Sequence, residues 1–182
     1  MNEKVERREQ NALYEQANAE HGAMMRRVAR GYEADAERQR DLLQEIHLEL
    51  WRSLGLFDGR CSLRTWVYRV AHNVAASHIV RQRRLASRLV DVEAIEKETT
   101  TAAAAVATDG AAQADQWHAA QRLLGLIYRL RPADRQIILL YLEGETAAAI
   151  GDVTGLSASN IATKIHRIKK LLQQQYHGGE EP

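Results

Sequence analysis

The scarcity of proline is the feature that most constrains the fold of this chain. Only two of its 182 residues are proline, Pro132 and Pro182, and proline is the residue that the interior of a helix tolerates least. Alanine, leucine, arginine, glutamate and glutamine are plentiful, and these residues have high intrinsic helix propensities. The sequence therefore predicts an all-α fold.

Composition sets further limits on the class of protein. Hydrophobic residues make up 45% of the chain and charged residues 27%, which is enough apolar material for a buried core. A single cysteine, Cys61, excludes an internal disulfide framework and a cysteine-rich zinc module. The sequence has no apolar run of about 20 residues, the length that a membrane span requires, and its charged N-terminus is unlike a signal peptide. We therefore expect a cytoplasmic protein.

Charge is distributed in blocks, although the net charge is only +1. Residues 59–90 contain seven arginines and no acidic residue, whereas residues 31–58 contain seven acidic and three basic residues. Such a division indicates one surface that faces a polyanion and a separate surface for another partner.

Residues 91–115 are predicted to be a flexible linker. They hold six acidic residues against one lysine, and a threonine–alanine run at 99–105 with few large apolar side chains. A segment of this kind cannot bury enough surface to offset the entropy lost on ordering. We therefore expect two small helical domains, residues 10–90 and 116–176, joined by this linker.

Two helices are predicted in the later part of the first domain. Apolar residues at 43, 46, 50, 51 and 54 follow helical spacing within residues 41–54. A turn-rich loop centred on Asp58–Gly59 comes next, and a long helix is expected over residues 63–89. The apolar residues of that long helix are expected to face inward: Leu63, Trp66, Val67, Val70, Val74 and Ile79.

The second domain carries the pattern of a helix-turn-helix. Pro132 ends a helix over residues 116–130 and begins the next one, which runs to about residue 142. A short helix over residues 145–153 is followed by Gly155 at the turn. Ser157 is a good N-cap for a last helix that reaches residue 176. The inward side of this motif is predicted to hold Ala147, Ile150, Val153, Leu156, Ile161, Ile165 and Ile168.

The last predicted helix has side chains suited to the major groove of DNA. Between residues 157 and 172 it holds four basic residues and no acidic one. Short polar side chains lie near its N-terminal end, which is the end that enters the groove in helix-turn-helix proteins. The alternative interpretation is a basic surface on a helix that only packs.

The long helix of the first domain suits single-stranded nucleic acid. It combines arginines with Tyr68 and Asn73 and contains no acidic residue. Unstacked bases need flat rings and hydrogen-bonding groups beside cations that neutralise phosphates. Trp66 is expected mainly in the core, so Tyr68 and Asn73 are the better candidates for contact with bases.

These segments together resemble a known family, the extracytoplasmic-function (ECF) sigma factors of the sigma-70 type. Residues 41–51 resemble the region 2.2 helix of that family, and residues 57–73 resemble its regions 2.3 and 2.4. Residues 129–135 resemble the start of region 4, and the helix-turn-helix is similar to region 4.2. The resemblance extends over residues 10–90 and 118–174, in the family's order with its linker between them.

The resemblance implies a subunit that directs bacterial RNA polymerase to promoters, melts the −10 element and is held inactive by an anti-sigma factor. The expected partners are the coiled coil of the largest polymerase subunit, the flap of the second-largest subunit and promoter DNA, with no cofactor. Candidates for docking the core enzyme are Asp41, Gln44, Glu45, Leu48 and Glu49. Candidates for the −10 element are Gly59, Arg60, Ser62, Arg64, Tyr68, Arg69, Asn73 and Arg81. Candidates for the −35 element are Ser159, Asn160, Thr163, Lys164, His166, Arg167 and Lys170.

Four residues depart from the family's usual pattern. His47 stands where phenylalanine is usual, Ser77 where aspartate is common, and Gly151 where alanine is common in the first helix of the helix-turn-helix. Ala162 stands where a basic residue is frequent, so one expected −35 contact is absent. These departures leave the promoter sequence open.

Other classes of function fit the sequence less well. There is no glycine-rich phosphate loop, nucleophile elbow or His-Glu-x-x-His helix, so we expect no enzyme and no metal site. His72 and His78 are six residues apart and would lie on different faces of a helix; lone histidines of this kind are expected at the surface or partly packed. An operator-binding regulator acting as a dimer is the main alternative, although no dimerisation helix is evident. A protein-interaction adaptor would leave the arginine block without a role.

Overall fold

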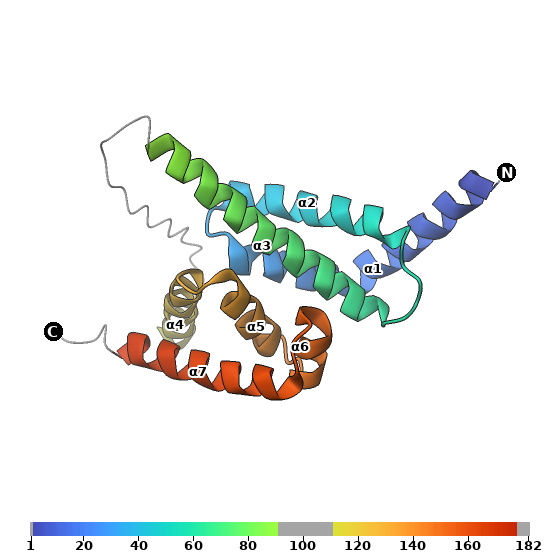
Figure 1. Ribbon diagram of the computed structural model, residues 1–182. Helices are drawn as coiled ribbons and strands as arrows, with labels where there is room; N and C mark the ends of the chain where they lie inside the picture. Colours follow the sequence, from blue (N-terminus) through green and yellow to red (C-terminus); the bar gives the residue numbers. More distant parts are fainter. Residues whose placement is uncertain (1, 91–110, 178–182) are drawn as a thin grey trace.

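The computed structural model describes residues 2–90 and 111–177, and within these ranges the chain is entirely helical (Figure 1). The first domain comprises α1 (Asn2–Tyr32), α2 (Ala36–Leu54) and α3 (Leu63–Val90). The second comprises α4 (Ala111–Tyr128), α5 (Pro132–Leu142), α6 (Ala147–Thr154) and α7 (Ala158–His177). The predicted all-α class is confirmed for the described residues. None of their helices combines the length and apolar character that crossing a bilayer demands.

The first domain is a bundle in which each of its three helices packs against the other two. The inward side of α2 consists of residues at steps of four, Leu42, Ile46, Leu50 and Leu54, all buried. This stripe differs from the predicted one, because Leu43 and Trp51 lie at its edges and are only half-buried. On α3 the buried positions are Val67, Tyr68, Ala71, His72, Ala75 and His78. The residues predicted inward, such as Val70 and Val74, pack against this core from its margin.

The helix α1 reaches well before residue 10, the predicted start of the domain. Its early turns are attached to α2 by polar side chains: Gln10 Nε2 donates to the carbonyl oxygen of Trp51 at 2.6 Å, and the Trp51 indole donates to Asn11 Oδ1 at 2.8 Å. The Tyr14 hydroxyl lies 3.0 Å from Nδ1 of His47. A histidine is therefore accommodated at the position where the family has phenylalanine, because α1 supplies it with a hydrogen-bonding partner.

The loop that joins α2 to α3 is shaped by its own polar residues. Gly59 has φ of 74°, a conformation that glycine adopts without steric cost. The Asp58 carboxylate accepts from the amide of Arg60 at 3.1 Å, and Ser62 Oγ accepts from the amide of Thr65 at 3.1 Å. The second bond satisfies one of the free amides at the start of α3.

The second domain follows the predicted helix-turn-helix closely. Pro132 occupies the first turn of α5, as predicted, and Arg131 is at the N-cap position. Gly155 ends α6 with φ of 77°, and Ser157 Oγ accepts from the amide of Asn160 at 3.3 Å at the start of α7. The predicted linker ended too late, since α4 already begins at Ala111; the rest of that linker, residues 91–110, lies outside the described residues.

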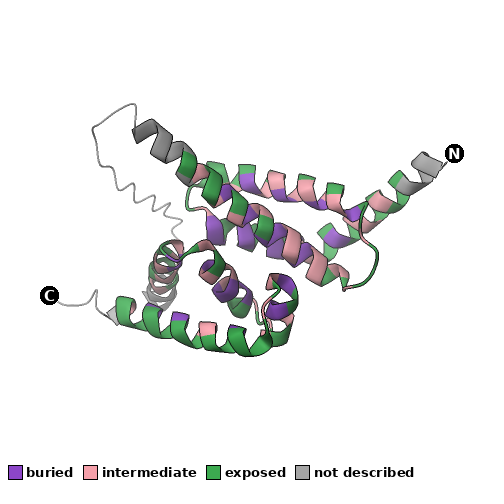
Figure 2. Cartoon of the chain, viewed as in Figure 1, coloured by how far each residue is buried: buried purple, intermediate pink, exposed green. Residues whose placement is uncertain are grey.

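Burial in the second domain also follows the predicted stripe (Figure 2). Ile150, Ile161 and Ile168 are at most 2% exposed, and Leu172 extends the stripe by one turn. Ala147, Leu156 and Ile165 pack against this core from its edge.

Gly151 allows the turn of the helix-turn-helix to pass close to α6. A Cβ atom at this position would lie 2.6 Å from the carbonyl oxygen of Leu156. That distance is shorter than a van der Waals contact, and the atom it meets is backbone, which cannot swing aside. The alanine that is common in the family is therefore excluded here unless the turn shifts.

We expect Gly151→Ala to destabilise the protein by about 1–3 kcal/mol, the usual cost of overpacking that forces the backbone to move. The matched control is Gly125→Ala on α4, where an added Cβ would meet no heavy atom within 4 Å. That control should stabilise the protein by about 0.5–1 kcal/mol, because alanine is the better helix former. Chemical denaturation of both variants measures the two effects, and equal stabilities would contradict the steric argument.

The two domains pack against each other through α1 and α3 on one side and α4, α5 and α6 on the other. Arg135 of α5 is 2% exposed and lies at this junction. Its guanidinium donates to carbonyl oxygens of Ile127 and Tyr128 at the end of α4, and to that of Tyr32 at the end of α1. Cations are favoured at helix C-termini, where carbonyl groups lack intrahelical partners.

Candidate nucleic-acid interface

The arginines predicted for the −10 element extend from the loop onto one long helix. Gly59, Arg60 and Ser62 are exposed in the loop, and Arg60 lies 3.0 Å from the Asp58 carboxylate while remaining 90% exposed. Arg64 is 55% exposed on the first turn of α3. Arg69 is half-buried, and Asn73 is exposed on the following turn.

Tyr68 is not at the surface, although the sequence analysis proposed it for contact with bases. Its side chain is 4% exposed and its ring stacks on that of His72, with centroids 6.3 Å apart and planes at 12°. Burial, together with Glu145 and Glu143 nearby, raises the pKa of Tyr68. In this arrangement the ring is part of the core, so Asn73 is the remaining polar candidate for a base contact.

Arg81 connects the arginine-rich helix to α2. Its Nη2 donates to Glu45 Oε2 at 2.7 Å, and this hydrogen bond is the main reason that the pKa of Glu45 is lowered. His78 is enclosed beside this pair, 3.6 Å from Glu45 and 3.5 Å from Glu33. A candidate for DNA contact and a candidate for polymerase docking thus share one ion pair.

His72 and His78 are both buried, so the prediction of surface or partly packed histidines is wrong for them. Nδ1 of His72 lies 3.1 Å from the Tyr32 hydroxyl, and burial lowers the pKa of His72 to about 3. The imidazole is therefore neutral at physiological pH. The described residues contain no cluster of three or more side chains that could hold a metal ion.

The candidates for docking the core enzyme form one face of α2. Asp41, Gln44 and Leu48 are exposed, and they recur at the three- and four-residue steps that share a helix face. Leu48 is 48% exposed and is the large apolar side chain of this face. Glu45 and Glu49 are half-buried at the margin of this face, and Glu49 pairs with Arg52 at 2.6 Å.

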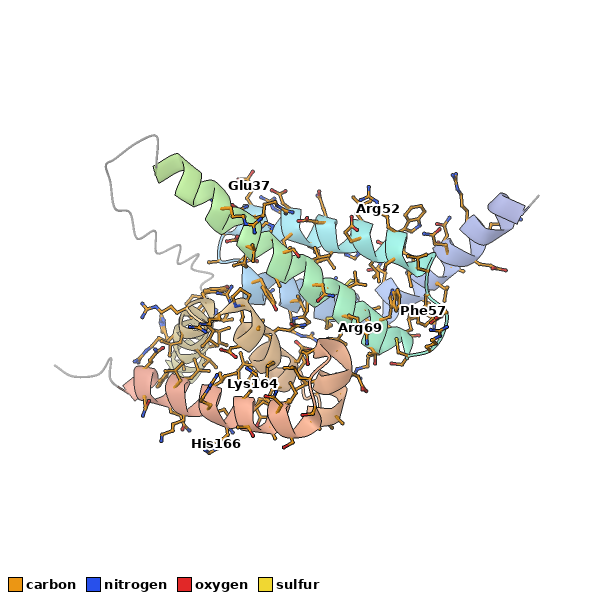
Figure 3. All side chains as sticks on the ribbon, viewed as in Figure 1. Glu37, Arg52, Phe57, Arg69, Lys164 and His166 are labelled. Atoms are coloured by element: carbon orange, nitrogen blue, oxygen red, sulfur yellow. The ribbon has the colours of Figure 1, made fainter. Side chains whose placement is uncertain are left out.

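The candidates for the −35 element lie on α7, and most of them face solvent. The exposed ones are Ser159, Asn160, Thr163, His166, Arg167 and Lys170. Lys164 is half-buried and lies 3.5 Å from the Asp134 carboxylate of α5 (Figure 3). The Thr163 hydroxyl donates to the carbonyl oxygen of Ser159 at 3.0 Å. The uncovered face of α7 therefore presents polar and basic side chains without rearrangement.

Three residues of the charged surface between the domains were not found by sequence analysis. Arg27 of α1 lies with the α3 arginines, and Glu143 and Glu145 face them from the turn between α5 and α6. Arg27 and Glu143 are 116 positions apart in the chain. No local pattern joins residues at such a distance, so only the packing of the two domains reveals them.

Comparison with known proteins assigns both domains. Residues 19–85 match the Sigma-70 region 2 family, and residues 120–172 match the Sigma-70, region 4 family. The chain therefore belongs to the sigma-70 family of RNA polymerase sigma factors, and its relatives are of the ECF type.

Individual relatives are distant or match over short stretches. The chain is 24% identical to the ECF RNA polymerase sigma factor SigW of Bacillus subtilis over 139 residues, covering 74% of this chain and 73% of SigW. It is 40% identical to the RNA polymerase sigma-H factor of Pseudomonas aeruginosa over 50 residues, which is 28% of this chain and 26% of that protein. The fold is similar to that of the sigma factor RpoE in its complex with the anti-sigma factor NepR from Bartonella quintana. That match has a TM-score of 0.64 and 18% identity, and it covers 92% of this chain and 98% of that one.

The buried state of His72 predicts a loss of stability in acid. The folded state holds the imidazole neutral with a pKa near 3, whereas the unfolded chain protonates it near pH 6.5. The unfolded state therefore binds more protons, and stability falls as the pH drops below about 6.5. At about pH 5 this group alone lowers the free energy of unfolding by about 2 kcal/mol.

We expect His72→Gln, which does not titrate, to show a shallower fall in unfolding free energy between about pH 7 and pH 5 than the unmodified protein. The control is His118→Gln at an exposed position of α4. Denaturant titrations across this pH range measure the difference, and parallel curves for all three proteins would show that His72 does not carry the effect.

Proposed function

We propose that this chain is the promoter-recognition subunit of a bacterial RNA polymerase, with region 2 docking the core enzyme and opening the −10 element and region 4 reading the −35 element. The observation that carries the proposal is the combination, in one chain, of both matched regions with three separate surfaces on α2, α3 and α7. Each surface has the chemistry that one of these tasks requires. As a subunit of RNA polymerase, the chain would act in the cytoplasm.

In this proposal the exposed face of α2 docks the core enzyme. An apolar residue framed by polar ones is typical of the centre of a protein interface, where a buried anchor contributes most of the affinity. Leu48 has this setting, with Asp41 and Gln44 on the same face. Region 4 would make the second contact with polymerase through the flap of its second-largest subunit.

The loop before α3 and the first turns of that helix would hold the melted −10 strand. Extruding a base costs a few kcal/mol, which a protein offsets by enclosing the base and neutralising the backbone. Gly59 supplies room in the loop, and Arg60, Arg64 and Arg69 supply the cations. Asn73 would make a polar contact with the strand.

The exposed face of α7 would enter the major groove at the −35 element. A bidentate contact from Arg167 to a base is worth about 1–3 kcal/mol of discrimination. Lys170, further along the helix, would contact the phosphate backbone and act on all sequences alike. Asn160, Thr163 and His166 complete the face, and Ser159 is at its N-terminal end.

An anti-sigma factor is the expected regulator. The structure with which this fold is compared is a sigma factor in complex with the anti-sigma factor NepR. By analogy, a partner of this kind would hold our chain away from polymerase.

We expect Leu48→Arg to weaken binding to core RNA polymerase by at least tenfold, because it places a charge in the centre of an apolar contact. Leu56→Arg is the matched control, since Leu56 is 79% exposed in the neighbouring loop and lies off the proposed docking face. Co-purification and fluorescence titration with core enzyme compare the variants. Full-strength binding by Leu48→Arg would exclude this face of α2 as the docking site.

We expect Asn73→Ala to reduce strand opening at a cognate promoter while core binding is unchanged, because the lost contact is made only to the opened strand. Ser77→Ala is the control, one turn further along α3 and also exposed. Permanganate footprinting of polymerase complexes measures opening. The −10 assignment of Asn73 is wrong if both variants open the promoter like the unmodified protein. Tight footprinting of a palindromic operator by the chain alone would instead favour a dimeric regulator.

A further inference from the structure

Region 4 covers part of the surface that region 2 would offer to the −10 strand. The helix α3 packs against α5 and α6, and α1 packs against α4 and α5 (Figure 1). The segment that lies on the arginines is the turn between α5 and α6, residues 143–146, which precedes the helix-turn-helix. The two domains are thus joined by charged contacts at a place of proposed function.

Two carboxylates of this turn bind arginines of region 2. Arg27 donates from Nε and Nη2 to the two carboxylate oxygens of Glu143, at 2.6 and 2.5 Å. Arg64 donates from Nε to Glu145 Oε1 at 3.0 Å, and its Nη2 bonds the same oxygen. The side chains of Glu143 and Glu145 are only 15% and 12% exposed, so the interface encloses both carboxylates.

The contacts continue along α3 beyond the ion pairs. Nη2 of Arg69 donates to the carbonyl oxygen of Asp152 in α6 at 2.6 Å, on the side of α3 that faces α6 (Figure 3). Tyr68, one residue earlier, is buried with Glu143 and Glu145 near its hydroxyl. Arg64, Tyr68 and Arg69 are therefore all engaged by region 4 or by the core beneath it.

The chemistry of these contacts is that of an arginine bound to nucleic acid. A planar guanidinium pairs with carboxylate and with phosphate through the same parallel hydrogen bonds. The α7 face remains uncovered, because its −35 candidates other than Lys164 are exposed in the same arrangement. The closed arrangement thus blocks one DNA-binding surface and leaves the other open.

We propose that region 4 inhibits region 2 in the free chain, with Glu145 occupying Arg64, one of the arginines proposed to hold the −10 strand, and Glu143 fixing the acidic turn on region 2 through Arg27. The inference rests on the proposed −10 function of the α3 surface. DNA and the acidic turn then compete for the same cations. The apparent affinity for the −10 strand is therefore the affinity of the open chain multiplied by the fraction of molecules that are open. The arginines of these pairs are more than half exposed, so salt screens the pairs in part. Polar interfaces between domains also separate readily, so the closure weakens as ionic strength rises.

The test uses the full chain with Glu143→Gln and Glu145→Gln combined, which removes both charges and keeps the side-chain shape. The control combines Glu15→Gln with Glu37→Gln, two exposed carboxylates on α1 and α2 that carry the same change in net charge. One readout is the distance between fluorophores on Arg38→Cys and Gln174→Cys, introduced in a Cys61→Ser background. The other is affinity for a mixed-sequence single-stranded oligonucleotide and for a mixed-sequence duplex.

We expect the interface variant to lengthen the distance between the fluorophores and to bind the single strand about tenfold more tightly, as for a chain in which about a tenth of the molecules are open. Affinity for the duplex and every property of the control should stay near those of the unmodified chain. Salt should weaken single-strand binding less steeply in the unmodified chain than in the interface variant, because salt also opens the former.

An unchanged fluorophore distance in the interface variant overturns the inference. The inference is also overturned if the interface variant binds the single strand no more tightly than the unmodified chain while Arg64→Ala weakens that binding. In that case Arg64 binds DNA in the unmodified chain without being masked. Failure of the proposed function gives a different pattern. The distance would lengthen, but Arg64→Ala would leave single-strand affinity unaltered even in the interface variant.

Discussion

The guanidinium of Arg135 lies where the two domains meet and bonds backbone carbonyl oxygens of both domains. It gathers carbonyl oxygens from the ends of α4 and α1, so the helix termini of separate domains converge on a single cation. A buried charge is tolerated only when its donors are satisfied, and the carbonyls in turn lack partners within their helices. Gly31 adds to the same junction, since a Cβ there would meet Leu139 of α5 at 2.8 Å. Gly31 thus leaves room for the Leu139 side chain where α1 and α5 meet.

The ion pairs between the domains differ in kind from this junction. They lie at its rim, where the enclosed carboxylates of Glu143 and Glu145 meet Arg27 and Arg64, each of which is more than half exposed. The cation of Arg135 is buried at helix ends, whereas the arginines of the rim pairs are open to a competing anion. An interface that has charged pairs at its rim is suited to opening without unfolding either domain.

Much of this fold follows from local sequence. Pro132 marks the start of α5, Gly155 the turn and Ser157 the first amides of α7, because each of these residues acts on its immediate neighbours. The exposed faces of α2 and α7 follow from helical periodicity in the same way. A helix boundary and an exposed helix face are each set by residues within one short stretch of the sequence.

What could not be predicted depends on contacts between distant segments. Tyr68 has an amphipathic side chain whose place is decided by its neighbours, and here His72 and the approach of region 4 bury it. His72 is buried because Tyr32, forty positions earlier, provides a hydroxyl for Nδ1. The early turns of α1 have too few apolar residues to predict packing, and they are attached to α2 by side chains such as Gln10 and Tyr14.

The ion pair between Arg81 and Glu45 has a consequence for how the two ends of region 2 communicate. Glu45 borders the proposed docking face of α2, and Arg81 belongs to the arginine-rich helix α3. In the proposed roles of these helices, a cationic group of a docked partner that pairs with Glu45 would release the guanidinium of Arg81, which is half exposed and free to pair with a phosphate instead. By linkage, DNA bound to Arg81 would make Glu45 a better acceptor for that partner by the same factor. The hydrogen bond of 2.7 Å between Arg81 and Glu45 would thus connect the two proposed binding surfaces of region 2 through a single pair of side chains.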